Sequence, residues 1–332
     1  MHRPLSRLIA LPFLLLALAV GGCVTDQQVI DQANSLHGQI EPTVVDTEDP
    51  ELARYVQAVG DRIVNAAGEL YEEGKLEGAE DWMFKDVKFH LVASPTLNAF
   101  TTGGKHVYLY SQLFEESETE DEFAAVVGHE FGHIIGKHVQ SGMRNQYLTL
   151  GAAAGAGLIG AALAEDGKRT QTATTVGGLA LAGGQVVGLS FGRENEREPD
   201  ELGFRFYVRA GYDPDQFAGF FQNMIDQGLD GPGGMQGYLS SHPQLSERVQ
   251  AAQQRAAQVS PDERRRYAQA PIAGDRELAS LHRQSVGYTA QAARAAKSQT
   301  TTAYTEALAI LAAFPACVGG EADGIPPSEQ AE

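Results

Sequence analysis

Apolar and polar residues recur along the chain with two different periods. Residues 52–63 carry apolar side chains every three to four positions, which is the period of one face of a helix. Asp49 and Pro50 open this segment, and they suit the N-cap and the first helical position. The pattern therefore predicts a long amphipathic helix that begins at Pro50.

A two-residue period follows further along the chain. Residues 87–91 alternate between apolar and polar side chains, which predicts a half-buried strand. Residues 98–110 place Gly103 and Gly104 between two extended segments rich in strand-forming residues, which predicts a turn joining two more strands. Since the remaining patterns are helical, we expect a mainly α protein with a small β-sheet, an α+β fold.

A second helical pattern begins near Thr119. Thr119 and Glu122 have the spacing of a capping box, and the acidic run "EESETEDE" lies where the helix dipole favours negative charge. We expect these acids to be solvated. Residues 148–189 hold two Ala/Gly-rich apolar runs of about 15 residues, too short to span a bilayer. A tightly packed helical hairpin is the prediction there, with contact to a membrane surface as the alternative.

The first 22 residues have the character of a secretory signal peptide. They combine Arg3 and Arg7 with an apolar run over residues 8–20. The run ends in the sequence Val-Gly-Gly-Cys, which resembles a bacterial lipobox, so Cys23 is the predicted lipidation site. By the same resemblance, Val24 favours the periplasmic side of the outer membrane of a Gram-negative cell.

The net charge of the chain argues against nucleic acid as a binding partner. The 332-residue chain has a formal charge of −18, and without residues 1–22, which contain two arginines and no acid, the charge is −20. Nucleic-acid binding is not expected, because it depends on clustered Lys and Arg. Of two cysteines, Cys317 has no partner if Cys23 is lipidated, so no internal disulfide is expected.

The stretch "VVGHEFGHIIGKHV" carries the candidate chemistry. It contains His129, Glu130 and His133 in the pattern H-E-x-x-H, a zinc-protease signature when it lies on a helix. The two histidines lie about 40° apart around a helix, so both can reach one metal ion. A catalytic zinc site needs three protein ligands and one open position, so one ligand is still missing.

His138 is one candidate for the third ligand. If the helix continues, a residue nine positions after His129 lies on the opposite face. In the metzincin pattern the third histidine is ten positions after the first, and Val139 occupies that position here. We therefore expect His138 to be a surface residue.

A carboxylate from a second helix is the other candidate. The stretch "RENEREPDELG" contains four acids, at positions 194, 196, 198 and 200. Glu196 and Asp200 are four residues apart and face the same way, so one could bind zinc while the other orients a histidine. Spacing alone does not choose among the four.

Taken together, these motifs resemble the HtpX-like and BepA-like zinc metallopeptidases, which are gluzincins with a zincin-like fold. The resemblance covers about residues 48–250 and rests on four stretches: "NAF" with the following Gly-Gly, "DEFAAVVGHEFGHIIGKH", "RENEREPDELGFRFYVRAGYDP" and "SSHPQLSERV". It implies that Glu196 is the third ligand, that Asp200 is the following acid, and that His242 belongs to a His-Pro motif that approaches the zinc and restrains activity. Arg248 follows this motif.

One residue departs from the family pattern. Pro199 stands where the family usually has Ala, and a proline inside a helix removes a hydrogen bond and bends the helix. The bend would fall between Glu196 and Asp200. The role of Asp200 in orienting a histidine is therefore open.

The predicted organisation is a signal peptide over residues 1–22, a lipidated tether over 23–47, a metallopeptidase domain over 48–255 and a partly disordered extension over 256–332. The expected activity is that of an endopeptidase with one Zn²⁺ per chain, in which Glu130 acts as the base for zinc-bound water and His242 takes part in the site.

The strand at Asn98, Ala99 and Phe100 is expected to pair with extended substrate. The resemblance implies unfolded or misassembled envelope proteins as substrates and a link to the outer-membrane assembly machinery, with the membrane reached through the lipid anchor. Two alternatives remain: an envelope chaperone or assembly factor with a silenced or structural zinc site, and a zinc hydrolase of non-peptide substrates.

Overall fold

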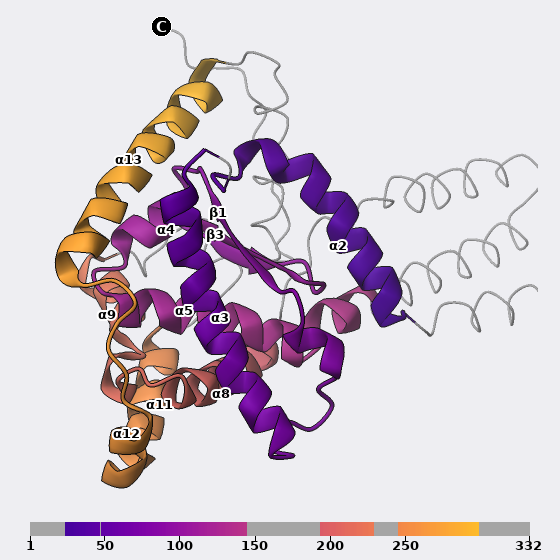
Figure 1. The fold of residues 1–332 in the computed structure, drawn as a ribbon, viewed down its shortest axis with the longest axis vertical. Helices are drawn as coiled ribbons and strands as arrows, with labels where there is room; N and C mark the ends of the chain where they lie inside the picture. Colours follow the sequence, from indigo (N-terminus) through magenta and orange to yellow (C-terminus); the bar gives the residue numbers. More distant parts are fainter. Residues whose placement is uncertain (1–23, 47, 145–192, 229–244, 299–332) are drawn as a thin grey trace, which may run out of the picture.

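The computed structural model describes residues 24–46, 48–144, 193–228 and 245–298 (Figure 1). The helices and strands of these residues are α2 Asp26–Ile40, α3 Pro50–Glu72, β1 Lys88–Val92, β2 Ala99–Thr101, β3 His106–Tyr110, α4 Ser111–Glu116, α5 Glu120–Ile135, α8 Arg193–Arg209, α9 Gly219–Asp226, α11 Leu245–Gln258, α12 Pro261–Tyr267 and α13 Asp275–Ser298. Short 3-10 turns cover Glu41–Thr43, Asp81–Phe84 and Pro214–Gln216. The predicted α+β class is confirmed.

The sheet has the strand order β1-β3-β2. Strand β1 runs parallel to β3, and β2 pairs with β3 in the antiparallel direction. The predicted turn lies between β2 and β3, where Gly103 has a φ of +75°, a conformation that few other residues adopt without strain. The strands predicted from alternation are therefore present, and β2 lies at one edge of the described sheet.

The two faces of the sheet have different neighbours (Figure 1). Phe89, Leu91, Val107 and Leu109 belong to the main core, which includes the apolar faces of α3 and α5. The side chains that alternate with them, among them Tyr108, point to the other face, which α2 covers. The sheet is thus a middle layer between α2 on one face and α3 and α5 on the other, and α5 carries the H-E-x-x-H motif.

Residues 26–40, within the predicted tether over residues 23–47, form helix α2. Thr25 caps it with a complete capping box: its side chain accepts from the backbone N–H of Gln28, whose side chain accepts from the backbone N–H of Thr25. Val29, Ala33 and Ile40 are buried against the rest of the fold. A polar sequence with three apolar positions on one face is enough to dock a helix on a sheet.

The acidic residues in the first turn of α5 differ from the expectation that they are solvated. Thr119 caps the helix as predicted, since its side chain accepts from the N–H of Glu122. However, Glu120 and Glu122 are buried rather than solvated. Glu120 accepts hydrogen bonds from the hydroxyls of Tyr55 at 3.4 Å and Tyr212 at 3.2 Å, which make its burial tolerable.

Residues beyond 255 extend this packing. The backbone N–H groups of Ile272 and Ala273 donate to Glu120 at 2.8 and 2.9 Å. On α13, Ser285 donates to Glu115 of α4 at 2.8 Å, and Thr289 donates to the same carboxylate. The domain boundaries stay predictions, but α12 and α13 give the predicted C-terminal extension ordered helical structure up to residue 298.

Several expectations fall outside the described residues. These are the signal peptide, Cys23, the hairpin at 148–189, His242 with Pro243, Cys317, and any disorder beyond residue 298. Among the residues that are described, no helix combines the length and apolarity needed to cross a membrane.

Candidate metal centre

Helices α5 and α8 approach each other closely because glycines line their contact. A Cβ atom added to Gly132 would lie 2.7 Å from the backbone oxygen of Pro199, and one added to Gly203 would lie 2.8 Å from the backbone carbon of Gly128. Helix α8 continues through Pro199, so Glu196 and Asp200 lie on one helix. This contact presents the acids of α8 to the histidines of α5.

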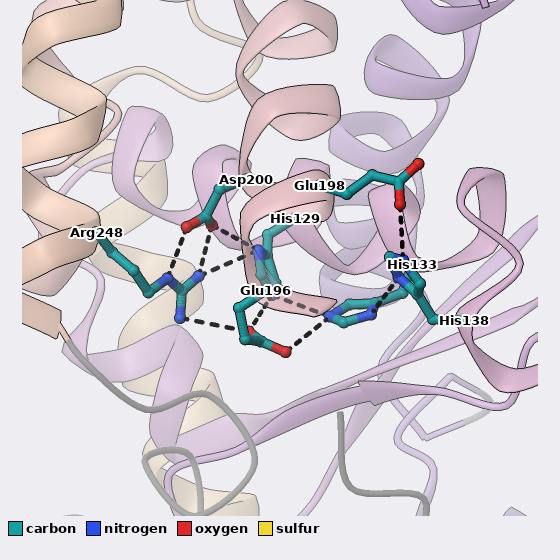
Figure 2. Close-up of polar contacts among 7 residues, drawn as sticks. All are labelled: His129, His133, His138, Glu196, Glu198, Asp200 and Arg248. Carbon is teal, nitrogen blue, oxygen red and sulfur yellow. Dashed lines mark hydrogen bonds and ion pairs between the residues drawn. The ribbon is translucent and has the colours of Figure 1, made fainter. Parts of the chain in front are cut away.

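Three buried side chains meet at this contact (Figure 2). A ring nitrogen of His129, a ring nitrogen of His133 and a carboxylate oxygen of Glu196 all lie within 4.8 Å of one another. The two Nε2 atoms are 3.1 Å apart. Glu196 Oε2 lies 3.3 Å from His129 Nε2, and Glu196 Oε1 lies 3.7 Å from His133 Nε2. Two imidazole nitrogens and one carboxylate form a donor set that suits zinc.

Asp200 contacts the other side of His129. Its Oδ1 lies 2.8 Å from His129 Nδ1 and, as a carboxylate oxygen, accepts the Nδ1–H. With its Nδ1–H donated to Asp200, His129 can bind a metal ion only through Nε2, the nitrogen that faces Glu196 and His133. The four-residue spacing of Glu196 and Asp200 therefore places one acid at each ring nitrogen of His129.

Arg248 of α11 holds Asp200 in place. Its Nε donates to Oδ2 at 2.9 Å and its Nη2 to Oδ1 at 2.8 Å, a bidentate pair that is almost fully buried. The guanidinium also lies 4.2 Å from the ring centroid of Phe221. No role was predicted for Arg248 from sequence. The sequence did contain a sign of a buried role, because Arg248 has the helical spacing that places it on the same face of α11 as the apolar residues Leu245 and Val249.

His138 corrects the prediction of a surface residue, since it is only 6% exposed. Helix α5 ends at Ile135, and Lys137 has a φ of +52°, so the angular argument from an unbroken helix does not apply. His138 Nδ1 lies 3.1 Å from His133 Nδ1, and His138 Nε2 lies 3.2 Å from Glu198 Oε2. These two hydrogen bonds favour the His133 tautomer that carries its proton on Nδ1 and presents its Nε2 lone pair to the centre of the site.

The electrostatics of the site favour a cation. Burial and Arg248 lower the pKa of His129, but Asp200 and Glu196 outweigh them and raise it to about 9. Burial also disfavours the charged form of Asp200, yet Arg248 and His129 hold the pKa of that carboxyl well below its usual range. The Asp200 carboxylate thus stays ionised, and the two acids beside His129 attract positive charge to its ring nitrogens, so the residues present fit a metal ion.

The remaining predicted residues lie as follows. Glu130 is buried on α5, next to the first histidine of the motif. Asn98 precedes β2 and accepts a backbone hydrogen bond from Tyr110 through its carbonyl oxygen at 3.1 Å, while Ala99 and Phe100 are the first residues of that edge strand. His242 is outside the described residues.

Comparison with known proteins adds independent information. The sequence model described as Peptidase family M48 matches residues 54–256, more than half of the chain. The Beta-barrel assembly-enhancing protease of Escherichia coli O157:H7 is 30% identical over 217 residues, which are 64% of this chain and 40% of that protein. The protein of the same name from Yersinia pestis is 30% identical over 215 residues, with the same shares.

Metalloprotease LoiP of Escherichia coli (strain K12) is 25% identical over 170 residues, 49% of this chain and 60% of that protein. This chain spans about two fifths of the length of the first two relatives. The matched residues include the H-E-x-x-H helix, α8 and α11, which build the centre described above. The expectation of a zinc metallopeptidase of this type is confirmed at the level of the family: the chain belongs to peptidase family M48.

Proposed function

We propose that the protein is a zinc-dependent endopeptidase that holds one zinc ion through His129, His133 and Glu196. The observation that carries this proposal is the buried cluster of three donor atoms within 4.8 Å of one another. The interactions with Asp200 and His138 support it, because each favours the histidine tautomer that a metal ion requires. Membership in family M48 supports peptide-bond hydrolysis as the reaction.

Zinc bound at this centre would acidify a water molecule and polarise the scissile carbonyl group. Glu130 accepts the proton from the attacking water and later delivers it to the leaving amine, as general base and then general acid. Asp200 keeps the proton of His129 on Nδ1. Arg248 keeps Asp200 ionised and fixed in orientation.

Extended, unfolded protein chains are the proposed substrates. Asn98, Ala99 and Phe100 lie at the edge of the sheet that the described residues form, and an edge strand can add an extended peptide through backbone hydrogen bonds. Strand β2 also packs against α5, which carries the catalytic motif. The name of the E. coli relative refers to β-barrel assembly, so we propose misassembled envelope proteins as the physiological substrates and a link to outer-membrane assembly.

Lipid attachment at Cys23 is the proposed means of localisation, on the periplasmic side of the outer membrane. The sequence Val-Gly-Gly-Cys after an apolar run supports it, and two or more acyl chains anchor a protein stably. Metabolic labelling with a fatty acid tests the proposal. Cys23→Ser should abolish labelling and release the protein from membranes, and failure of the wild type to take up label would refute it.

His242 is proposed to restrain activity by approaching the metal, a role that rests on the family resemblance. His242→Ala should then raise basal casein cleavage at equal zinc content. A fall of roughly 10²-fold would instead indicate a donor that stabilises the developing oxyanion. Unchanged cleavage would indicate that His242 has no role at the metal.

The central test is Glu130→Gln. This substitution keeps the size and burial of the side chain but removes the base, so casein cleavage should fall by roughly 10²–10⁴-fold while zinc stays stoichiometric. Glu201→Gln, an exposed glutamate on α8, is the matched control and should change neither property. Full zinc content with undiminished cleavage in the Glu130 variant would exclude the proposed mechanism.

An assembly or chaperone role is a second candidate, favoured by the words "assembly-enhancing" in the name of the E. coli relative. The Glu130→Gln variant also tests it. If the variant cleaves nothing yet still suppresses aggregation of an unfolded β-barrel protein, the chain has a binding function separate from proteolysis. Loss of both would leave proteolysis as the function.

A further inference from the structure

A second cluster of histidines lies far from the H-E-x-x-H motif in sequence and is built on different elements. His37 comes from α2, His90 from β1 and His106 from β3. One ring nitrogen from each lies within 4.8 Å of the other two. His90 and His106 stack on Tyr108, so the cluster lies on the sheet face that α2 covers, opposite the face that packs on α5.

The outer nitrogens of two of these rings are held by oxygen acceptors. His90 Nδ1 lies 2.7 Å from Asp46 Oδ2, and His106 Nε2 lies 3.0 Å from Asn34 Oδ1. Since both oxygens only accept, each ring carries its proton on that outer nitrogen when it is neutral. Hydrogen bonding of the outer ring nitrogen to a carboxylate or a carbonyl oxygen is the usual support for a metal-binding histidine.

The inner nitrogens then present a conflict. His90 Nε2 and His106 Nδ1 are 2.9 Å apart, and in the neutral rings each carries a lone pair directed at the other. A positive charge between them, either a proton or a metal ion, would relieve the repulsion of the two lone pairs. Two nitrogens that share a tetrahedral zinc ion at about 2.0–2.1 Å lie roughly 3.3–3.4 Å apart, so only a small separation is needed. At the candidate metal centre formed by His129, His133 and Glu196, called the M48 site below, the two histidine Nε2 atoms are 3.1 Å apart.

His37 supplies the third nitrogen. Its ring is stacked on those of His90 and His106, with centroids 4.5 Å away in both cases, so the ring must turn within the cluster to direct a lone pair at the same ion. Its Nδ1 lies 3.1 Å from the hydroxyl of Tyr108, which can accept the Nδ1–H.

We propose that His37, His90 and His106 form a second metal site, for a transition-metal ion that prefers imidazole nitrogen, with zinc as the first candidate. Three nitrogen donors suit Zn²⁺, Cu²⁺ or Ni²⁺ and do not suit Ca²⁺ or Mg²⁺, which prefer oxygen. The ion joins α2 to β1 and β3. Its role is to fasten helix α2 to the sheet, because these three elements contribute one ligand each.

The test counts metal ions in the mature, untagged chain at a buffered low concentration of free zinc. Wild type should bind two equivalents. His90→Gln and His106→Gln should each bind one, and His133→Gln should also bind one, because it removes the M48 site instead. His282→Gln is the matched control, a half-buried histidine outside both clusters, and should keep two.

Two further readings separate this site from the M48 site and from misfolding. His90→Gln should keep casein cleavage while losing one equivalent, which shows that the fold is intact. Cobalt bound to His133→Gln should show d–d absorption bands that disappear in His90→Gln/His133→Gln. A failure of the proposed M48 ligand set would appear as two equivalents in the His133 variant and would leave the His90 result unchanged.

The proposal is overturned if wild type binds a single equivalent that the His90 and His106 variants retain. That result would mean that a proton, rather than a metal ion, fills the gap between the two nitrogens. The proposal is also overturned if a second equivalent survives both substitutions, because the ion would then lie elsewhere.

Discussion

Asp200→Asn separates the two tasks of a residue that contacts both a proposed ligand and a buried arginine. Asparagine keeps the shape of the side chain but removes its charge, so His129 loses the carboxylate that accepts from Nδ1 at 2.8 Å. Loss of such an outer partner weakens metal binding roughly 10- to 100-fold, or about 1.4–2.8 kcal/mol. Zinc affinity, measured by competition with a chromophoric chelator, should fall by that factor.

The same substitution leaves Arg248 with an unbalanced charge. Its side chain is 6% exposed, and its next carboxylate, Glu196, is 3.9 Å away. Removing one partner of a buried ion pair costs about 3–5 kcal/mol, and the nearby Glu196 places this case at the lower end. We expect about 3 kcal/mol less free energy of unfolding in urea with chelator present, and a melting temperature lower by roughly 6–12 °C.

A second substitution, Arg248→Met, completes the experiment. Methionine keeps an unbranched stem on the ring of Phe221 and removes the charge. The double variant Asp200→Asn/Arg248→Met should regain most of the lost stability, because no charge is left unpaired, but should not regain zinc affinity. The reasoning fails if Asp200→Asn changes stability by less than about 1 kcal/mol, or if the double variant is no more stable than the single one.

Three further predictions follow from the same contacts. Glu196→Ala should remove most of the zinc from the M48 site, whereas His138→Ala should retain it with affinity lowered by about tenfold, since His138 only orients a ligand; metal analysis showing the reverse would exclude the assignment. Gly132→Ala should destabilise the fold by about 1–3 kcal/mol in urea unfolding, because the added Cβ would lie 2.7 Å from a backbone oxygen of α8. Gly68→Ala is the control on α3. Its added Cβ would meet nothing closer than 3.9 Å, so this variant should be more stable by up to about 1 kcal/mol in the same measurement. Burial lowers the pKa of His282, so the folded chain binds this proton less tightly than the unfolded chain, where histidine titrates near 6.5. The contribution of His282 to the free energy of unfolding is therefore fully present above that pH and is lost as the pH falls below it. His282→Leu should reduce the loss of unfolding free energy measured between pH 7.5 and 5.5, and an equal loss in both proteins would contradict the argument.

The sequence by itself determined the local features of the protein. Periodicity placed α3 after its Asp49 cap and the strands around the Gly103 turn, because side-chain spacing reports directly which face of an element is apolar. The H-E-x-x-H spacing placed His129 and His133 on one side of α5 for the same geometric reason. These features depend only on residues within a few positions of one another.

The sequence was less informative where a residue's environment comes from distant segments. Asp26–Ile40 has only three buried apolar positions, so its polar composition indicated a tether although the segment docks as a helix. The acids at the start of α5 were expected in water, but tyrosine hydroxyls and backbone N–H groups from other segments meet Glu120. His138 was assigned from the angle of a helix that ends before reaching it.

Only the tertiary structure decided which groups meet at the candidate metal centre. Four acids on α8 were equivalent by spacing, and Glu196 was selected from them by resemblance alone. In the structure, the glycine-lined contact with Pro199 sets the position of α8 against α5, and Arg248 arrives from a third helix. The same holds for His37, His90 and His106, which no local motif connects. Burial and charge pairing are properties of contacts between segments far apart in the chain, and spacing within one segment does not specify its partner.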